Sequence, residues 1–194
     1  MKPMTNHTQT KQQLRTQLKK KRLALSEQQV ATFSKQILAQ LTRTKEYKQA
    51  KQILLYHPIQ NEVDPTTLFR TTTTNKTFCL PRICSKTNRL HIHKITDPQT
   101  LKTGKFKIKE PGTKHQIIAR KNIDLVITPG LAFDTQGHRI GYGKGYFDRL
   151  FKNLSTKAFK IALAYDFQII ENVPAEKHDQ KVDLIVTEKR KIKP

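Results

Sequence analysis

Glycine is concentrated in one stretch of the chain, between residues 130 and 145. Five of the seven glycines lie there: Gly130, Gly137, Gly141, Gly143 and Gly145. Glycines at alternate positions let a backbone approach an anion closely and point several N–H groups toward it. Lys144 adds a mobile positive charge, and Arg139 adds a planar guanidinium that suits phosphate oxygens. The stretch therefore predicts a phosphate-binding loop.

The spacing of this loop differs from two common nucleotide-binding motifs. A Walker A loop needs Ser or Thr after its lysine, whereas Lys144 is followed by Gly145. The glycine spacing also differs from that of the dinucleotide-binding fingerprint. Because glycine clusters serve plain turn geometry as well, an ordinary tight loop is the alternative to phosphate binding.

Two carboxylates are candidate ligands for a magnesium ion. Asp148 follows the loop in the first turn of a predicted helix, where the helix dipole stabilises a carboxylate that could hold magnesium beside bound phosphates. A plain charge at a helix N-terminus is the alternative. Asp183 begins a late apolar strand, where on the residues alone a cap or a solvent contact is the more usual role.

The N-terminal residues predict two helices. Leu14 and Leu18 are spaced four apart within the basic segment 11–22, as in a helix that buries only a narrow stripe. Ser26 and Gln29 form a capping-box pattern, and apolar residues then keep helical spacing to about residue 43.

Strand and helix signals alternate through the rest of the chain. Four short apolar blocks predict buried strands: 53–56, 124–128, 161–165 and 184–186. The segments 77–80, which stops at Pro81, and 90–95 predict two more strands around a polar turn. Helices are predicted over 64–71, where the threonines 71–74 end the helix, and from 146 to 154. This order favours an α/β fold with a mostly parallel sheet flanked by helices.

Length and charge narrow the class of protein. A chain of 194 residues favours a single domain, residues 1–194. The formal net charge of +22 attracts phosphates, polyglutamates and nucleic acid alike, although most lysines fit solvated faces. Residues 1–13 are polar and no apolar run approaches ~18 residues, so we expect neither a signal peptide nor a membrane span. A soluble, cytoplasmic protein is expected.

Two smaller clusters point to packing in preference to chemistry. Cys79 and Cys84 are the only cysteines, too few for a disulfide scaffold, and we expect reduced, partly buried thiols instead of a redox pair. His91 and His93 would share one strand face, but no Cys or carboxylate lies at ligand spacing, so a zinc site is not expected.

The glycine-rich segment resembles the signature of the 5-formyltetrahydrofolate cyclo-ligases, also called methenyltetrahydrofolate synthetases. The matching residues are Pro129-Gly130-Leu131-Ala132-Phe133-Asp134, Gly137, Arg139 and Gly141-Tyr142-Gly143-Lys144-Gly145-Tyr146-Phe147-Asp148-Arg149. Further matches span nearly the whole chain: Lys11-Gln12-Gln13-Leu14-Arg15, Asn61-Glu62-Val63-Asp64, Leu80-Pro81-Arg82, Glu110-Pro111 and Lys181-Val182-Asp183.

The resemblance implies a phosphoryl-transfer reaction with ATP as co-substrate and Mg²⁺ as cofactor. The formyl oxygen of 5-formyltetrahydrofolate attacks the γ-phosphate and forms an imino-phosphate, whose carbon the bridge nitrogen then attacks. Loss of phosphate leaves 5,10-methenyltetrahydrofolate and ADP, so the protein mainly positions reactants and neutralises charge. The expected substrate includes polyglutamylated folate and the expected state is a monomer. A basic nucleic-acid-binding protein is the alternative, without a recognisable binding motif.

Residue roles follow from the same resemblance. The implied ATP contacts are Lys11, Arg15, Arg139, Gly141, Gly143, Lys144, Gly145, Tyr146 and Phe147. Lys144 is also the implied catalytic residue, which stabilises the transferred phosphate. The implied folate contacts are Glu62 with Tyr56 or His57, together with Tyr142 and Tyr146. Asp148 and Asp183 are the implied magnesium ligands. Phe147 departs from the family, which often has a second tyrosine there.

Overall fold

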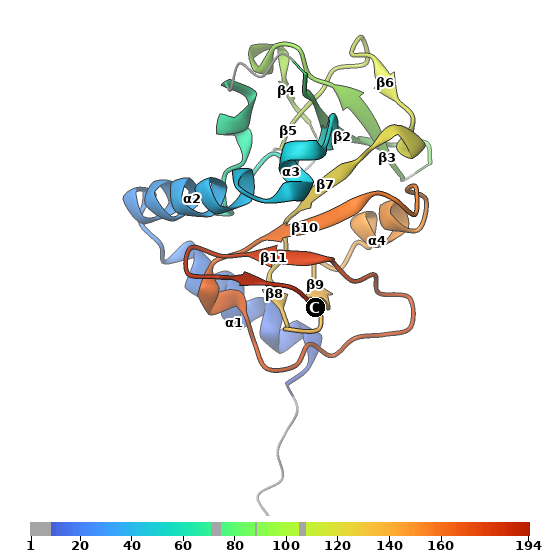
Figure 1. The fold of residues 1–194 in the computed structure, drawn as a ribbon. Helices are drawn as coiled ribbons and strands as arrows, with labels where there is room; N and C mark the ends of the chain where they lie inside the picture. Colours follow the sequence, from blue (N-terminus) through green and yellow to red (C-terminus); the bar gives the residue numbers. More distant parts are fainter. Residues whose placement is uncertain (1–8, 71–74, 88, 105–107) are drawn as a thin grey trace, which may run out of the picture.

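An eight-stranded sheet runs through the protein (Figure 1). The structure is a computed structural model that describes residues 9–70, 75–87, 89–104 and 108–194, so the threonines predicted to end a helix lie outside it. The strands of the large sheet are β1 (Gln52–Leu54), β2 (Thr77–Cys84), β3 (Arg89–Lys94), β6 (Ile117–Ile118), β7 (Leu125–Thr128), β10 (Phe159–Leu163), β11 (Leu184–Val186) and β12 (Lys191–Ile192).

The centre of this sheet is parallel and its edges are antiparallel. The strand order is β12-β11-β10-β7-β1-β2-β3-β6, and the five strands from β11 to β2 run parallel to their neighbours. The antiparallel pairs are β11 with β12, β2 with β3, and β3 with β6. The predicted α/β fold with a mostly parallel sheet is confirmed.

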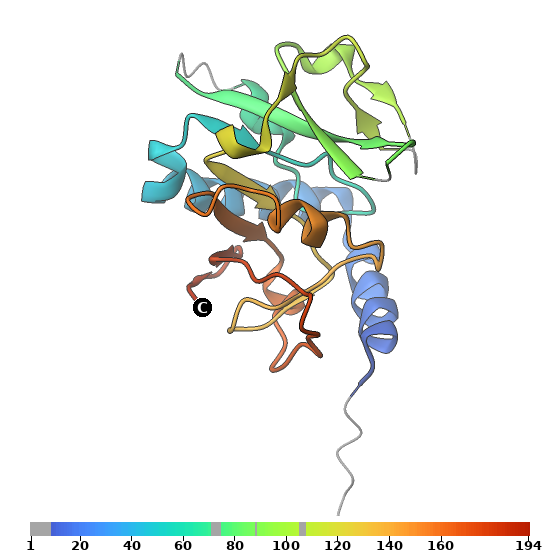
Figure 2. The same ribbon diagram turned by 90° about the vertical axis from the view of Figure 1, so that its right-hand side faces the viewer.

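Helices cover both faces of the sheet (Figure 2). Helices α2 (Glu27–Thr42) and α3 (Lys45–Gln49) pack on the face that carries Ile53, and α4 (Tyr146–Phe151) packs on the face that carries Leu54. Successive residues of a strand point to opposite faces of the sheet. With helices on each face, both Ile53 and Leu54 of β1 are buried. The predicted capping box is present at the start of α2, where Ser26 Oγ accepts from the backbone N–H of Gln29.

Helix α1 (Lys11–Leu23) packs against a small hairpin made by β8 (Ala132–Phe133) and β9 (Arg139–Ile140). Leu14 and Leu18 are the buried leucines of this helix, as their spacing predicts, and they contact Ala132 and Ile140. The hairpin was not predicted. It separates the buried strand β7 from the glycine-rich loop, so the loop begins at the end of a two-residue strand.

Several boundaries differ from the prediction: β1 and β10 begin and end earlier than predicted, and α4 ends at Phe151 instead of residue 154. Two further differences have a local cause. Strand β2 continues through Pro81, which is paired with Ile92 of β3. The opposite neighbour, β1, pairs with β2 only as far as Cys79, so a residue without an N–H is tolerated at this unpaired edge. The helix predicted over 64–71 is a 3₁₀ helix, Thr66–Arg70. Asp64 Oδ1 accepts from the backbone N–H of Thr66 at 2.8 Å, and a short segment that begins with two β-branched threonines and buries only Leu68 favours a 3₁₀ turn.

The remaining elements are short. Among the residues that the structure describes, they are the two-stranded sheet of β4 (Lys102–Thr103) and β5 (Lys109–Glu110) and three 3₁₀ turns, Pro98–Thr100, Arg120–Asn122 and Asp166–Gln168. Both cysteines are free thiols, as predicted, since the five residue steps between them along strand β2 place them roughly 16 Å apart. Within the described ranges, no helix has the length and apolar character that a membrane span requires.

Candidate active site

The glycine-rich loop, residues 141–145, connects β9 to α4 through two left-handed turns. Gly143 has φ 85° and Gly145, the N-cap of α4, has φ 61°. Residues other than glycine rarely adopt these backbone angles, so glycine is needed at both positions. Gly145 ends the loop with its backbone turned into the first turn of α4, and the predicted loop-to-helix step is confirmed.

A cleft of about 240 Å³ opens at this loop, lined by Gly143, Lys144, Gly145, Asp148, Arg149, Lys152 and His178. Three of these side chains carry positive charge and one carries negative charge. The two glycines expose their backbone to the cleft. A positively charged hollow with close backbone approach suits a polyanion such as a triphosphate. The structure therefore brings the predicted catalytic lysine and one predicted metal ligand to the same cleft.

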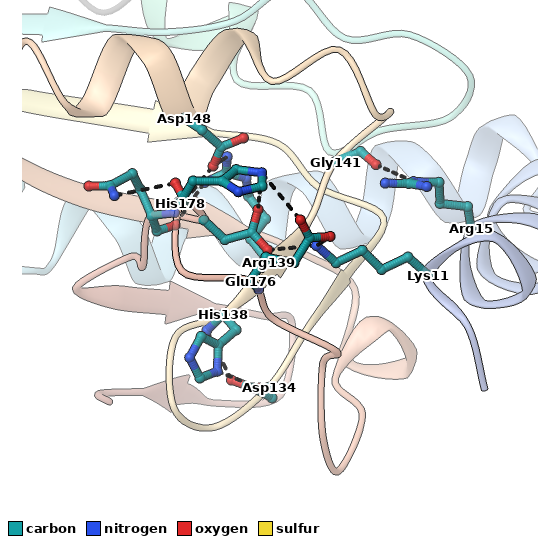
Figure 3. Close-up of polar contacts among 11 residues, drawn as sticks. Lys11, Arg15, Asp134, His138, Arg139, Gly141, Asp148, Glu176 and His178 are labelled. Atoms are coloured by element: carbon teal, nitrogen blue, oxygen red, sulfur yellow. Dashed lines mark hydrogen bonds and ion pairs between the residues drawn. The ribbon is translucent and has the colours of Figure 1, made fainter. Parts of the chain in front are cut away.

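Arg139 supports the cleft from beneath. Its Nη2 lies 2.8 Å from Asp148 Oδ1, and its side chain is only 3% exposed (Figure 3). The guanidinium also lies 4.9 Å from the ring centre of Phe151. Arg139 is absent from the cleft lining, so in this structure its fork orients Asp148 and does not face the space where a phosphate would lie.

The two predicted magnesium ligands have different surroundings. Asp148 lines the cleft, and its Oδ1 accepts a second hydrogen bond, from the backbone N–H of Gln180 at 3.3 Å. Asp183 lies at the start of β11, where its carboxylate accepts from the backbone N–H of Lys160 at 2.8 Å and lies 3.3 Å from Lys160 Nζ. The described residues contain no group of three or more His, Cys, Asp or Glu side chains that could hold a metal. A magnesium ion does not require such a group, because one or two carboxylates suffice when phosphates and waters complete its coordination shell.

Helix α1 closes over the glycine-rich loop from the other side. Lys11 Nζ lies 2.7 Å from both Glu176 Oε1 and Asp179 Oδ2, and Arg15 Nε donates to the carbonyl of Gly141 at 3.0 Å (Figure 3). Of the two residues of α1 that are predicted to contact ATP, Arg15 therefore contacts the loop, whereas Lys11 contacts residues 176–179. Lys11 is held by carboxylates, which are the type of group that a phosphate would replace.

Asp134 organises the hairpin that carries Arg139. The residue is fully buried, and its Oδ1 accepts from the backbone N–H groups of Gln136 and His138 at 3.0 and 2.9 Å. Its Oδ2 accepts from the backbone N–H of Val173 at 3.1 Å and lies 2.9 Å from His138 Nδ1. Four contacts to one carboxylate make the tip of the hairpin rigid, which fixes the start of the glycine-rich loop.

The five predicted folate contacts have different surroundings. Tyr142 Oη donates to Glu62 Oε1 at 2.7 Å, although the two residues are far apart in the sequence. Tyr56 is buried and its hydroxyl donates to the carbonyl of Val63 at 2.6 Å, which is a core role. His57 is half-buried beside it, and burial lowers its pKa. Tyr146 lies under the guanidinium of Arg149, at 5.1 Å.

Arg22 is the polar residue of this region that was not predicted. Its side chain is 1% exposed, and its Nη1 lies 3.6 Å from Glu62 Oε1. Arg22 also donates to the hydroxyl of Tyr142. The signal was available in the sequence, because Arg22 follows Leu18 by the same four-residue step that separates Leu14 from Leu18. A residue on the buried stripe of a helix is expected to be buried.

An α/β protein whose glycine-rich loop, lysine and carboxylate share one positively charged cleft is of the class that binds nucleotide phosphates. The sequence model of the 5-formyltetrahydrofolate cyclo-ligase family matches residues 7–188, and the chain belongs to this family. The basic nucleic-acid-binding alternative gains no support from this match.

Relatives of this family resemble the chain over most of its length. The 5-formyltetrahydrofolate cyclo-ligase of Haemophilus influenzae is 32% identical over 177 residues, which cover 89% of this chain and 95% of that protein. The enzyme of the same name from Mus musculus is 28% identical over 190 residues, which cover 92% and 93%. The structure of the Aquifex aeolicus 5,10-methenyltetrahydrofolate synthetase superposes with a TM-score of 0.84 at 36% identity, over 94% of this chain and 92% of that one.

Proposed function

We propose that the protein converts 5-formyltetrahydrofolate to 5,10-methenyltetrahydrofolate, with hydrolysis of ATP to ADP and phosphate. One observation carries this proposal: residues 142–148 border both halves of the site. Lys144 and Asp148 line the charged cleft, while Tyr142, at the start of the loop, donates a hydrogen bond to Glu62. Family membership supports the same reaction, and residues 1–194 would act as one domain.

The nucleotide would lie along the glycine-rich loop with its phosphates in the cleft. Lys144 is the proposed catalytic residue, since an ammonium group there would stabilise charge on the phosphoryl group as the formyl oxygen attacks it. Arg15, Tyr146 and Phe147 would contact the nucleotide, with the loop backbone N–H groups. Lys11 would exchange its two carboxylate partners for a phosphate.

Asp148 is the proposed magnesium ligand in this cleft. Asp148 presents a carboxylate beside three cationic side chains and is oriented by Arg139, so it would hold the ion, with Asp183 as the second predicted ligand. When bound, the ion would neutralise phosphate charge. For Asp183 to contribute, its carboxylate would have to leave Lys160.

The reduced folate would lie against Glu62 and Tyr142. A carboxylate is an acceptor only, so Glu62 would accept hydrogen bonds from the N–H groups of the pterin ring, with His57 and Tyr146 at the edges and Tyr56 behind. We also propose that the protein acts as a cytoplasmic monomer and accepts polyglutamylated substrate.

The test is an absorbance assay, because the methenyl product absorbs in the near ultraviolet. The protein is mixed with 5-formyltetrahydrofolate in the presence and absence of ATP and of magnesium. Growth of the product band that requires both supports the proposal. A folded protein that binds ATP without forming the product would instead act on another phosphoryl acceptor, and one that binds no ATP would contradict the assignment.

A further inference from the structure

Arg22 is a buried cation without a role in the reaction described so far. Its Nε donates to the carbonyl of Gln60 at 2.9 Å, its Nη1 donates to the carbonyl of Gly130 at 3.3 Å, and its Nη2 donates to Tyr142 Oη. A buried guanidinium is tolerated only where its donors find acceptors. These acceptors tie the last turn of α1 to three segments: the turn before Glu62, the turn after β7, and the glycine-rich loop.

Glu62 depends on these contacts because it is only 4% exposed. Burial raises its pKa, while Arg22, the hydroxyl of Tyr142 and the backbone N–H of Ile59 act in the opposite direction. The Ile59 N–H donates to Glu62 Oε2 at 3.0 Å, and Tyr142 donates to Oε1. Arg22 is thus the one cation that favours the ionised form of this buried acid.

The backbone before Glu62 is held in an uncommon conformation. Gln60 and Asn61 have φ values of 51° and 59°, the only positive values of non-glycine residues in the described chain. Arg22 holds the Gln60 carbonyl, and the Asn61 side chain donates to the carbonyl of Leu25 at 2.9 Å. Left-handed residues persist where the surroundings over-determine them, and they cluster at ligand sites. Here the strained turn aims Glu62.

We propose that Arg22 is a positioning residue for the reduced folate, whose guanidinium holds Glu62 and Tyr142 in the arrangement that meets the pterin ring. This inference rests on the proposed function. Arg22 acts through its two partners and does not reach the cleft itself. Because Tyr142 is adjacent to Gly143, the same guanidinium aligns the folate contacts with the loop that borders the nucleotide cleft.

The experiment compares wild type with Arg22→Met, which keeps the length of the side chain and removes its charge and donors. Lys21→Met is the matched control, because Lys21 is exposed in the same turn of α1. Binding of 5-formyltetrahydrofolate and of ATP is measured separately by calorimetry, and KM and kcat by absorbance. In Arg22→Met the folate Kd should rise about 10- to 100-fold, the effect of losing a charged hydrogen-bond partner. ATP binding should stay within about twofold, and the control should match wild type.

A pH profile separates positioning from simple packing. The groups that face Glu62 are Arg22, Tyr56, Tyr142 and Tyr165, and burial raises the pKa of each of these tyrosines, in Tyr165 to about 12. None of these tyrosines therefore titrates in the range of a carboxyl group, so a change of folate binding in acid reports on Glu62, whose pKa burial raises. In Arg22→Met, folate binding should weaken as pH falls, with its midpoint at a higher pH than in wild type. Adding Glu62→Gln to Arg22→Met should remove that shift.

Equal loss of folate and ATP affinity in Arg22→Met would overturn the proposal, as would an unchanged folate Kd. If this variant does not fold, Arg22→Lys decides, because it keeps the charge without the planar fork. It should bind folate with intermediate affinity and keep the wild-type pH profile, and an unchanged Kd would again overturn the proposal. Wild type that forms no product with ATP would refute the proposed function itself, whereas active wild type with unaltered variants would refute only the role of Arg22.

Discussion

At the scale of single residues, Lys144 has the position that a charge-stabilising group requires. It stands between Gly143 and Gly145, both in left-handed conformations, and it lines the cleft. The backbone on either side is determined by the glycines, while the ammonium group extends from a flexible four-carbon chain. In the proposed reaction, the lysine would therefore follow the phosphoryl group during transfer without any change in the loop.

Replacing this lysine should slow the reaction more than it weakens binding. Lys144→Ala is expected to lower kcat by about two to three orders of magnitude, because the charge that develops during transfer loses its stabilising partner. Steady-state kinetics with both substrates measures this, and Lys157→Ala, an exposed lysine beyond α4, is the control. Near-normal turnover in Lys144→Ala would contradict the catalytic role.

Residue types allowed most of the candidate site to be predicted, and the exceptions have physical reasons. The loop glycines, Lys144 and Asp148 are local in sequence, so a motif could reveal them. Arg22 was missed because arginine is usually exposed, and its burial depends on acceptors from three distant segments. The predicted ATP contact of Arg139 stays a prediction. Its guanidinium lies 2.8 Å from Asp148 Oδ1, a pairing between β9 and α4 that the sequence does not reveal.

At the scale of elements, the β8–β9 hairpin determines where the glycine-rich loop begins. Gly137 at its turn has φ 85°, and a Cβ there would lie 2.6 Å from the carbonyl oxygen of Val182. The backbone N–H of Val182 in turn donates to the carbonyl of Gly137 at 3.0 Å. The hairpin is therefore in direct backbone contact with the segment that leads to Asp183.

Gly137→Ala should destabilise the protein by about 2 kcal/mol or more, since it adds both a backbone penalty and a clash with main chain that cannot rotate away. Gly141→Ala is the matched control, because its added Cβ would meet nothing within 4 Å. Urea unfolding gives both values. A loss of stability of similar size in the two variants would contradict the argument.

The contact between α1 and residues 176–179 should depend on pH. Burial raises the pKa of Asp179, but the hydrogen bond and charge of Lys11 and the backbone N–H of Glu176 together outweigh burial, so the pKa is lowered overall. Stabilisation by a carboxylate with a lowered pKa is present above its unfolded pKa, about 3.9, and is lost as pH falls through the folded value. Asp179→Asn should therefore cost about 0.5 kcal/mol at neutral pH, and the difference should vanish in acid. Thermal unfolding from neutral pH into acid measures it, and a constant difference would refute the role of Lys11.

Elements with strong local signals were predicted and those set by neighbours were not. The capping box of α2, the strands β7 and β11 and the helix after the loop all follow from spacing and caps. The passage of β2 through Pro81 depends on where β1 ends, and the antiparallel edge strands of two residues carry too little pattern.

At the scale of the whole molecule, the net charge of +22 creates a field that reaches beyond the cleft. A folate with several glutamates carries more negative charge than one with a single glutamate, so its association should be steered more strongly. As ionic strength rises and the Debye length falls from about 30 to 3 Å, kcat/KM should fall more steeply for the polyglutamate. Parallel salt dependence for the two substrates would show that the field does not act on the tail.

The site is closed by contacts between segments at opposite ends of the chain. Lys11 meets Asp179 across 168 positions and Arg15 meets Gly141 across 126. During synthesis at about 5–20 residues per second, helix α1 therefore emerges many seconds before the partners that hold it. Until then Leu14, Leu18 and Arg22 lack the apolar surface and the acceptors that cover them in the folded protein, and an isolated helix of this length is only marginally stable in water. The contacts that close the candidate site can therefore form only after residue 179 has been synthesised.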